Sequence, residues 1–152
     1  MNKLIVILGP TAVGKTDLAI KLAQKFDGEI VSADSRQVYK EMDIGTAKPE
    51  KSQISNLKSQ KYLVKGIPHY LIDVVSPNEE FNVAIYKRLA TKIIKDIQKR
   101  GKLPFLVGGT GLYIWAVVDN LKFPEVGPWK KLRKELKKKS VKELFDYARK
   151  LC

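Results

Sequence analysis

Cysteine is almost absent from this chain, whose 152 residues include only Cys152. A single cysteine excludes an internal disulfide framework and is typical of proteins from a reducing compartment. Long apolar runs are absent too, and no stretch approaches the roughly 18 residues needed to cross a bilayer. The first residues do not resemble a signal peptide, because their short apolar run turns directly into a glycine-rich loop. We therefore expect a cytoplasmic protein without a membrane segment.

Histidine is equally rare in the sequence. His69 is the single histidine, and no cluster of cysteine, histidine and carboxylate residues with metal-ligand spacing surrounds it. A structural role explains such a histidine better than metal binding or catalysis does.

Acidic residues are scarce relative to basic ones. The chain has 16 Asp and Glu against 29 Lys and Arg, which gives a formal net charge of +13. This excess favours a polyanionic partner, with nucleic acid the first candidate and an acidic membrane surface the second. Much of the charge lies in segment 129–152, which follows a proline-bracketed linker and has ten basic and three acidic residues. A capping-box pattern from Ser140 to Glu143 predicts a helix there. Its apolar stripe would consist of Val141, Leu144, Phe145, Ala148 and Leu151.

One glycine-rich segment, residues 9–16, organises the chain. Two glycines five positions apart, followed by a lysine and a hydroxyl residue, form the pattern of a phosphate-binding loop. The glycines allow a backbone whose N–H groups point at phosphate oxygens, and the lysine adds a mobile positive charge. The threonine hydroxyl can reach a Mg²⁺ held by the same phosphates. The loop consists of Gly9, Pro10, Thr11, Ala12, Val13, Gly14, Lys15 and Thr16.

The sequence on either side of the loop fits this interpretation. Residues 4–8 are all apolar, as expected for a strand buried on both faces. After the loop, apolar residues recur at helical spacing from Leu18 to Phe26, and Gly28 follows as a stop signal. Strand, glycine loop and helix in this order predict that the chain binds a phosphorylated small molecule. The alternative is a chance glycine-rich turn in an α/β domain.

Strands and helices alternate in the rest of the chain. Short apolar runs at 30–31, 70–75 and 103–107 are read as strands, and Asn82 can cap a helix between the last two. The alternation predicts an α/β fold with a parallel sheet. The polar segment 49–61 is interpreted as an exposed helix or a mobile excursion. The helix after Asn82 would carry Ile85, Leu89, Ile93 and Ile97 along one face.

Polar residues and glycines stand where these strands end. Because the carboxyl ends of parallel strands meet at one edge of a sheet, Asp34 would face the phosphate loop. A helix N-cap or a turn explains Asp34 equally well. Asp73 resembles a metal-facing carboxylate, although a strand-end turn explains it somewhat better. The glycines around Thr110 indicate a second place where backbone approaches a ligand closely. The helix predicted after these glycines, 112–118, is strongly apolar, and we expect it to lie in the core or at an interface.

Four segments together resemble the bacterial tRNA dimethylallyltransferases, also called tRNA isopentenyltransferases. They are Gly-Pro-Thr-Ala-Val-Gly-Lys-Thr at 9–16, Ser-Ala-Asp-Ser-Arg-Gln-Val-Tyr at 32–39, Met-Asp-Ile-Gly-Thr-Ala-Lys-Pro at 42–49 and Gly-Gly-Thr-Gly-Leu-Tyr at 108–113. The resemblance implies a P-loop NTPase-like parallel sheet flanked by helices, with the start of a helical insertion at the C-terminus. It implies a prenyltransferase core over 1–123 and a basic helical segment over 124–152 that begins the tRNA-binding insertion.

The resemblance also implies an activity and its residues. The family transfers a dimethylallyl group from dimethylallyl diphosphate to the exocyclic amine of an adenosine beside the tRNA anticodon. By resemblance, Asp34 is the base, and residues 9–16 bind the diphosphate. Lys15 and a Mg²⁺ on Thr16 would stabilise the leaving group. The target nucleotide would be bound by Asp34, Ser35, Arg36 and Gln37, with Thr110 lining the passage where donor and adenine meet.

The chain departs from the family in its length, because members are considerably longer and continue with a basic Gln-Arg segment. We therefore expect a chain that is cut short. We also expect a monomer. Two alternatives stay open: a phosphate-loop kinase for a small molecule, with ATP as donor, and a non-catalytic tRNA-binding remnant that uses its basic tail.

Overall fold

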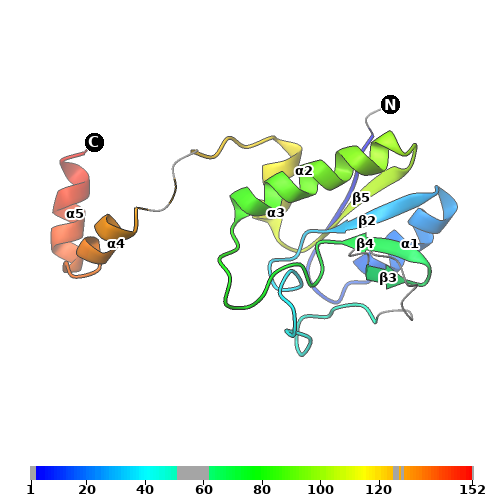
Figure 1. The fold of residues 1–152 in the computed structure, drawn as a ribbon, viewed down its shortest axis with the longest axis horizontal. Helices are drawn as coiled ribbons and strands as arrows, with labels where there is room; N and C mark the ends of the chain where they lie inside the picture. Colours follow the sequence, from blue (N-terminus) through cyan, green and yellow to red (C-terminus); the bar gives the residue numbers. More distant parts are fainter. Residues whose placement is uncertain (1–2, 51–61, 125–126, 128, 152) are drawn as a thin grey trace. The chain divides into compact units, whose positions relative to one another are not determined.

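The structure is a computed structural model that describes residues 3–50, 62–124, 127 and 129–151. It divides into two compact units, Met1–Lys122 and Phe123–Cys152 (Figure 1). Cys152 and nearly all of the polar segment 49–61 lie outside the described residues, so the interpretation of that segment stays a prediction.

The first unit is built on one five-stranded sheet with the strand order β1-β5-β2-β4-β3. β1 pairs with β5, β5 with β2 and β2 with β4 in parallel, and only β3 is antiparallel to its neighbour β4. The strands are β1 (Ile5–Leu8), β2 (Gly28–Ser32), β3 (Tyr62–Val64), β4 (Ile67–Tyr70) and β5 (Leu103–Gly108). The helices of this unit are α1 (Lys15–Lys25), α2 (Val83–Lys99) and α3 (Gly111–Val118).

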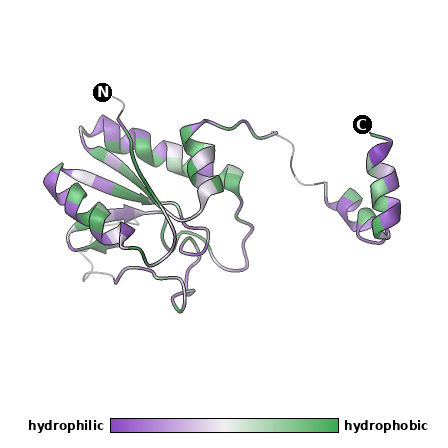
Figure 2. Cartoon of the chain, turned by 180° about the vertical axis from the view of Figure 1, so that it is seen from behind, coloured by the Kyte–Doolittle hydropathy of each residue, from purple (hydrophilic) through white to green (hydrophobic). Residues whose placement is uncertain are grey.

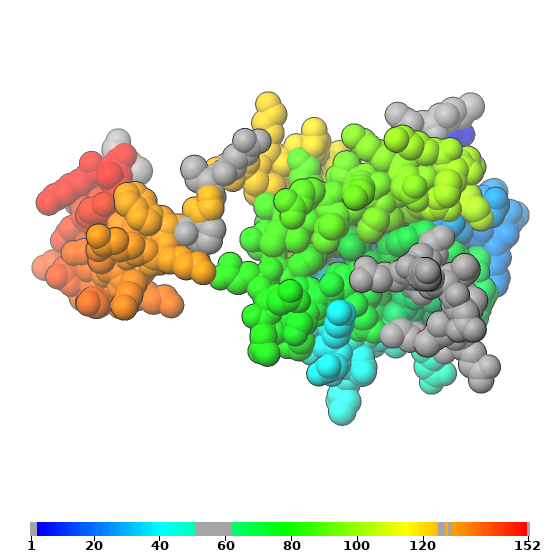
Figure 3. All heavy atoms as spheres, in the orientation of Figure 1, coloured from blue at the N-terminus to red at the C-terminus, as the bar shows by residue number. Residues whose placement is uncertain are grey.

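Helices cover both faces of this sheet. Successive residues of a strand point to opposite faces, so Ile30 and Val31 of β2 belong to two different cores. Val31 packs with residues of α2 and α3, and Ile30 packs with residues of α1. In the space-filling view of Figure 3, residues of α2, in green to yellow-green, form part of the surface that faces the viewer. The predicted α/β fold, a largely parallel sheet flanked by helices, is confirmed.

The prediction that the first strand is buried on both faces is wrong. Ile5 and Val6 are each 39% exposed and Leu8 is 57% exposed. Among the described strands β1 lies at the edge of the sheet, where β5 is its one neighbour. An apolar run indicates that a segment forms a strand with a preference for burial. Whether that strand lies at the centre or at the edge of the sheet depends on pairing with strands that are distant in the sequence. The predicted stop at Gly28 is also displaced, since Asp27 takes the left-handed conformation (φ 49) and Gly28 begins β2.

The predicted strand at 70–75 is wrong as well. Leu71 (φ 62) and Asp73 (φ 54) have left-handed backbone, which ends β4 at Tyr70. The strand instead begins at Ile67, after a tight turn at Lys65 and Gly66 with positive φ at both positions. That turn joins β4 to β3, a strand of three residues that the sequence reading missed.

The predicted helix after Asn82 is confirmed, with a shifted buried face. The Asn82 side chain accepts hydrogen bonds from the backbone N–H groups of Ala84 and Ile85, each 3.0 Å long. Ile97 is buried as expected, whereas the three expected isoleucine and leucine positions before it are only half-buried. The buried positions are Tyr86, Ala90, Ile94 and Ile97. Tyr86 fixes this face, because its hydroxyl donates to the Ser32 carbonyl (2.9 Å) and its ring stacks on Tyr113 at 4.0 Å.

The second unit contains two helices, α4 (Lys130–Leu136) and α5 (Val141–Arg149). The capping box is confirmed: Ser140 Oγ accepts from Glu143 N–H (3.3 Å), and Glu143 Oε2 accepts from Ser140 N–H (2.7 Å). The short helix α4 was missed. No residue of α5 is buried, and Val141 is 84% exposed. Figure 2 shows hydrophobic and hydrophilic residues interleaved along α5. Across the described ranges of both units, no helix has the length and apolarity of a membrane span.

Candidate functional site

The phosphate loop joins the end of β1 to the start of α1, the order that the sequence predicted. Ala12 (φ 66) and Gly14 (φ 85) both take left-handed backbone, and Gly14 is the N-cap residue of α1. Left-handed residues in a loop turn successive N–H groups to one side, where they form a concave site for an anion. Gly9, expected to need such a conformation, does not have one: Ala12 takes that role.

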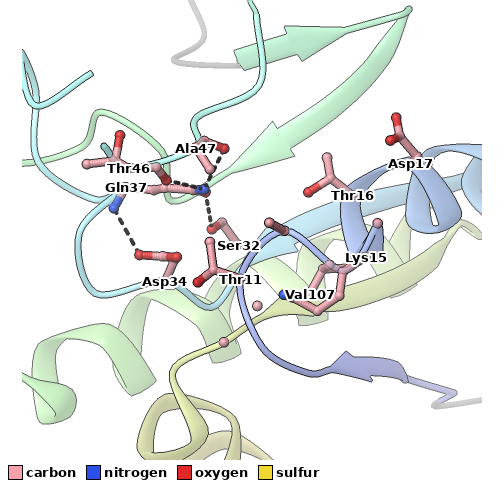
Figure 4. Close-up of a pocket in the computed structure, with 14 residues that line it drawn as sticks. Thr11, Lys15, Thr16, Asp17, Ser32, Asp34, Gln37, Thr46, Ala47 and Val107 are labelled. Atoms are coloured by element: carbon pink, nitrogen blue, oxygen red, sulfur yellow. Dashed lines mark hydrogen bonds between the residues drawn. The ribbon is translucent and has the colours of Figure 1, made fainter. Parts of the chain in front are cut away.

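The lysine of the loop is folded back on the loop itself. Lys15 Nζ donates a hydrogen bond to the carbonyl of Pro10. A phosphate oxygen in the loop can replace this carbonyl as the acceptor of the Lys15 ammonium. Thr16 and Asp17 follow it in the first turn of α1, and the hydroxyl of Thr16 is turned into the neighbouring cavity (Figure 4).

That cavity, which we call the loop cavity, has a volume of about 270 Å³. Its walls come from the phosphate loop, the ends of β2 and β5, and the loop at Thr46 and Ala47 (Figure 4). The side chains of Lys15, Thr16 and Asp34 all line it. The structure therefore brings the three predicted catalytic residues together from two separate segments of the chain.

Asp34 combines the two interpretations that the sequence left open. Its Oδ1 accepts hydrogen bonds from the backbone N–H of Arg36 (2.8 Å) and of Gln37 (3.3 Å), the geometry of an Asx turn. Its other carboxylate oxygen has no hydrogen-bond partner in the described ranges. One oxygen thus fixes the carboxylate in place, and the other remains available to a ligand.

The ends of β2 and β5 are held together beside Asp34. Thr110 N–H donates to the Ala33 carbonyl (3.1 Å), and the hydroxyl of Thr110 accepts from Ser35 N–H (3.0 Å). A Cβ on Gly108 would lie 2.1 Å from the Ala33 carbonyl oxygen, so only glycine fits there. Gly108 thus lets two segments of backbone approach each other. Gly108 and Gly109 also line the loop cavity, and the expected close approach of backbone to a ligand stays a prediction.

A second cavity of about 330 Å³ adjoins the loop cavity and shares Thr11, Asp34, Thr46 and Gly109 with it. We call it the outer cavity. Ser35, Arg36 and Thr110 line it, and Asp34 belongs to the walls of both cavities. Ser35 and Arg36 are exposed, as residues that meet a large substrate would be. Their contact with a nucleotide stays a prediction.

Gln37 has a different arrangement from the one that nucleotide binding would require. Its Nε2 donates to the carbonyls of Thr46 (3.1 Å) and Ala47 (3.2 Å), and its Oε1 accepts from Ser32 Oγ (3.0 Å) (Figure 4). Both amide hydrogens are therefore in use. In this structure Gln37 connects β2 to the loop at 46–47, and its predicted contact with a nucleotide would need these bonds to change.

Lys48 is a residue that the sequence reading did not single out. Its Nζ donates to the Tyr39 carbonyl (2.7 Å), to Asp43 Oδ1 (2.8 Å) and to Asp73 Oδ1 (2.7 Å), and its side chain is 4% exposed. Burial alone would lower the pKa of Lys48, but hydrogen bonds and attraction from the two carboxylates outweigh it, so the pKa is raised. Lys48 holds the 39–48 loop against the end of β4. No local pattern identifies this role, because Asp73 is 25 positions away from Lys48 in the sequence.

This ion pair bears on the suggestion that Asp73 faces a metal. Asp73 Oδ1 receives the Lys48 ammonium, which supports a strand-end structural role. Across the parts of the chain that the structure describes, no group of three His, Cys, Asp or Glu could hold a metal ion. The hydroxyl of Thr16 in the loop cavity fits a Mg²⁺ that takes its other ligands from phosphate and water.

Comparisons with known proteins agree with this geometry. The family model described as IPP transferase matches residues 37–151. A tRNA dimethylallyltransferase from Caldicellulosiruptor saccharolyticus is 55% identical over 147 residues, which covers 94% of this chain and 44% of that protein. One from a Roseiflexus species is 52% identical over 141 residues and covers 93% of this chain and 43% of that protein.

Solved structures of the same kind share the fold. The full-length tRNA isopentenylpyrophosphate transferase of Bacillus halodurans matches with a TM-score of 0.70 and 42% identity, over 99% of this chain and 48% of that one. A eukaryotic dimethylallyltransferase acting on tRNA matches with a TM-score of 0.66 and 35% identity, over 86% of this chain and 31% of that one. The chain thus spans less than half the length of each of these relatives. By its sequence and by its fold, the chain belongs to the IPP transferase family.

Proposed function

We propose that this chain supplies the diphosphate site and the base of a tRNA dimethylallyltransferase. The observation that carries the proposal is the position of Asp34 on the walls of both the loop cavity and the outer cavity. A group-transfer enzyme needs such a residue between its donor and its acceptor. The names of the relatives, tRNA dimethylallyltransferase, support this reaction over phosphoryl transfer from ATP.

The diphosphate of dimethylallyl diphosphate would occupy the loop cavity. The N–H groups around Ala12 and Gly14 would donate to its oxygens, together with the N-terminus of α1. Lys15 would leave the Pro10 carbonyl and bind the same oxygens. Its contact strengthens as negative charge develops on the departing diphosphate, which lowers the barrier. A bound Mg²⁺, held by Thr16 and the diphosphate, would add further charge neutralisation.

The acceptor adenosine would enter through the outer cavity. Its exocyclic amine is a weak nucleophile because the nitrogen lone pair is conjugated with the ring, so removal of a proton favours attack. As the new N–C bond forms and the C–O bond to diphosphate breaks, the free oxygen of Asp34 would take the amine proton. Thr110 and Ser35, joined by a 3.0 Å hydrogen bond, would line the approach. The adenine must leave the stack of its loop to reach this position.

The second unit would contribute to tRNA binding. Segment 129–152 has ten Lys and Arg against three acidic residues, and such a surface attracts phosphate irrespective of base sequence. We assign this unit a share of the RNA affinity, because contacts to phosphate carry no sequence information. That the chain acts as a monomer stays a prediction.

Calorimetric competition tests the donor site directly. Dimethylallyl diphosphate should bind the chain, and inorganic diphosphate should displace it, because both place the same group in the loop cavity. ATP should compete less well than either. Binding and displacement by ATP alone, with no effect of diphosphate or of the prenyl donor, would favour a kinase instead.

A further inference from the structure

The single histidine of the chain lines a small cavity that shares Thr16, Ser32 and Gln37 with the loop cavity. His69 is in β4, pairs with Ile30 of β2, and is 2% exposed. Its Nδ1 lies 3.0 Å from the carbonyl of Ile67, and a carbonyl accepts only from a protonated nitrogen. Burial lowers the pKa of His69, in spite of this backbone hydrogen bond, so the ring is neutral at pH 7. The proton therefore sits on Nδ1, and Nε2 has a lone pair that needs a donor.

No such donor is present in the described ranges, where Nε2 of His69 is the one buried side-chain nitrogen or oxygen without a hydrogen-bond partner. A buried acceptor that stays unsatisfied costs about 1–3 kcal/mol. Such a cost is normally avoided by an ordered water when the site is polar and large enough.

The space for that water is present beside the ring. His69 lines a small cavity of about 20 Å³, and a single water needs roughly 10–15 Å³. The other polar side chains on its wall are those of Thr16, Ser32 and Gln37. With His69 Nε2, these side chains would offer a water the two to four polar partners that a stable buried water requires. The same three residues also line the loop cavity.

We propose that His69 is a positioning residue for the diphosphate site, acting on Thr16, Ser32 and Gln37 through one buried water in this cavity. The identity of the ligand, a diphosphate, rests on the proposed function. The presence of the water rests on the geometry around His69 alone. The water donates one hydrogen to His69 Nε2 and its second to an oxygen of Ser32 or Gln37.

The water then has its own lone pairs left for the Thr16 hydroxyl. If Thr16 donates its hydrogen to the water, the oxygen lone pairs of Thr16 are directed into the loop cavity. A hydroxyl that binds a cation must present oxygen and send its hydrogen elsewhere, because a cation repels the positive end of the O–H bond. His69 thereby sets the orientation of a hydroxyl that it does not touch.

The water and the tautomer can be observed in the unaltered 152-residue protein by NMR. Nitrogen shifts of His69 should show a protonated Nδ1 and a bare Nε2 at pH 7.5. The ring should show a nuclear Overhauser contact to a water of long residence. A protonated Nε2, or a ring without such a water, would overturn the proposal whatever the ligand does.

Substitution tests the positioning role. His69→Phe keeps a ring and removes the acceptor, and we expect Mg²⁺-dependent binding of inorganic diphosphate to weaken about tenfold, as for other residues that orient a metal ligand. Binding without Mg²⁺ should change less than roughly threefold, because the loop N–H groups are untouched. His69→Gln, whose side-chain oxygen can accept from the water, should restore most of the Mg²⁺ effect.

Ile72 supplies the matched control, since it lines the same small cavity with an apolar side chain. Ile72→Leu should leave the Mg²⁺ dependence unchanged. Equal losses with and without Mg²⁺ in His69→Phe would mean a purely structural role and would contradict the positioning role. Failure of the unaltered protein to bind diphosphate at all would instead contradict the proposed function, and the NMR result would still stand.

Discussion

Gly108 of β5 lies against Ala33 at the end of β2, so closely that a Cβ on Gly108 would stand 2.1 Å from the Ala33 carbonyl oxygen. The obstacle is backbone, which cannot rotate away as a flexible side chain can. The same carbonyl accepts the Thr110 N–H at 3.1 Å, and Asp34 follows Ala33 directly. The spacing of these two residues therefore sets the position of Asp34 relative to Thr110.

Gly108→Ala should destabilise the first unit and displace Asp34. Overpacking of this kind costs about 1–3 kcal/mol. Urea denaturation measures the loss. Gly111→Ala is the matched control, because a Cβ there meets no atom within 4 Å and the residue begins α3. We expect this control to be neutral or stabilising by about 0.4–1 kcal/mol. Similar losses of stability in Gly108→Ala and Gly111→Ala would contradict the close approach of Gly108 to Ala33.

Lys15→Ala should weaken the binding of inorganic diphosphate. It removes a charge-assisted contact of about 1.5–3 kcal/mol, equivalent to roughly a tenfold to hundredfold loss of affinity. Titration calorimetry at fixed ionic strength measures the change. The control is Lys21→Ala, which removes a lysine of α1 that lines neither cavity. It changes the net charge by the same amount as Lys15→Ala, and it should bind diphosphate as the parent protein does. Equal effects of the two variants would indicate that only net charge matters.

Asp34→Asn should abolish prenyl transfer and leave tRNA binding close to intact. Asparagine keeps an oxygen for the N–H groups of Arg36 and Gln37, so the turn survives, but it cannot take a proton. Loss of a general base costs about 10²–10⁴-fold in rate. Single-turnover transfer is measured in a length-restored protein, in which the remaining sequence of the Caldicellulosiruptor saccharolyticus relative follows this chain. A rate within a few-fold of the parent would remove Asp34 from the role of base.

Lys48→Met should loosen the loop that carries the Gln37 contacts. The substitution leaves Asp73, whose side chain is 20% exposed, without its ammonium partner, which we expect to cost about 2 kcal/mol after allowance for solvent. Lys65→Met is the control, since Lys65 and Asp17 are both about two-thirds exposed or more and such pairs contribute about 0–1 kcal/mol. Hydrogen exchange across 39–48 measures the loosening. Unchanged protection in Lys48→Met would show that other contacts hold this loop.

Local chemistry explains what the sequence could predict. The phosphate loop, the Asn82 cap and the Ser140 capping box each depend on residues within a few positions of one another, and each lies where the pattern placed it. Residues that act through distant partners were missed. Lys48 reaches Asp73 across 25 positions, and Tyr86 reaches the Ser32 carbonyl across 54. No periodicity in the sequence encodes such contacts, which is why the buried face of α2 was misplaced.

The sequence could likewise predict some features of the candidate site and not others. Asp34 could be placed near the phosphate loop because parallel strands end at one edge of their sheet. The commitment of one Asp34 oxygen to a turn, and of both Gln37 amide hydrogens to carbonyls, depends on loop conformation. The exposure of β1 depends on strand order, which apolar content does not specify.

The last prediction concerns the pH dependence of stability, which His69 should dominate as the solution is acidified through about pH 6.5. Burial lowers its pKa in the folded protein below the value of about 6.5 that an unfolded chain has. Between these two values the unfolded state binds more protons than the folded state. The free energy of unfolding must then rise with pH in this window and fall as the solution is acidified through about pH 6.5. His69 is the single histidine of the sequence, so no other imidazole contributes.

Urea denaturation at pH 7.5, 6.5 and 5.5 measures this slope. His69→Gln, which has no titrating group and keeps a hydrogen-bonding side chain, should have a flatter profile over the same range. Its stability at pH 7.5 can be lower than that of the parent, because the prediction concerns the slope and not the absolute value. A parent protein whose stability is constant from pH 7.5 to 5.5, or increases on acidification, would contradict a neutral, buried His69. An equal slope in His69→Gln would assign the effect to other groups, such as carboxylates whose pKa values differ between the folded and unfolded states.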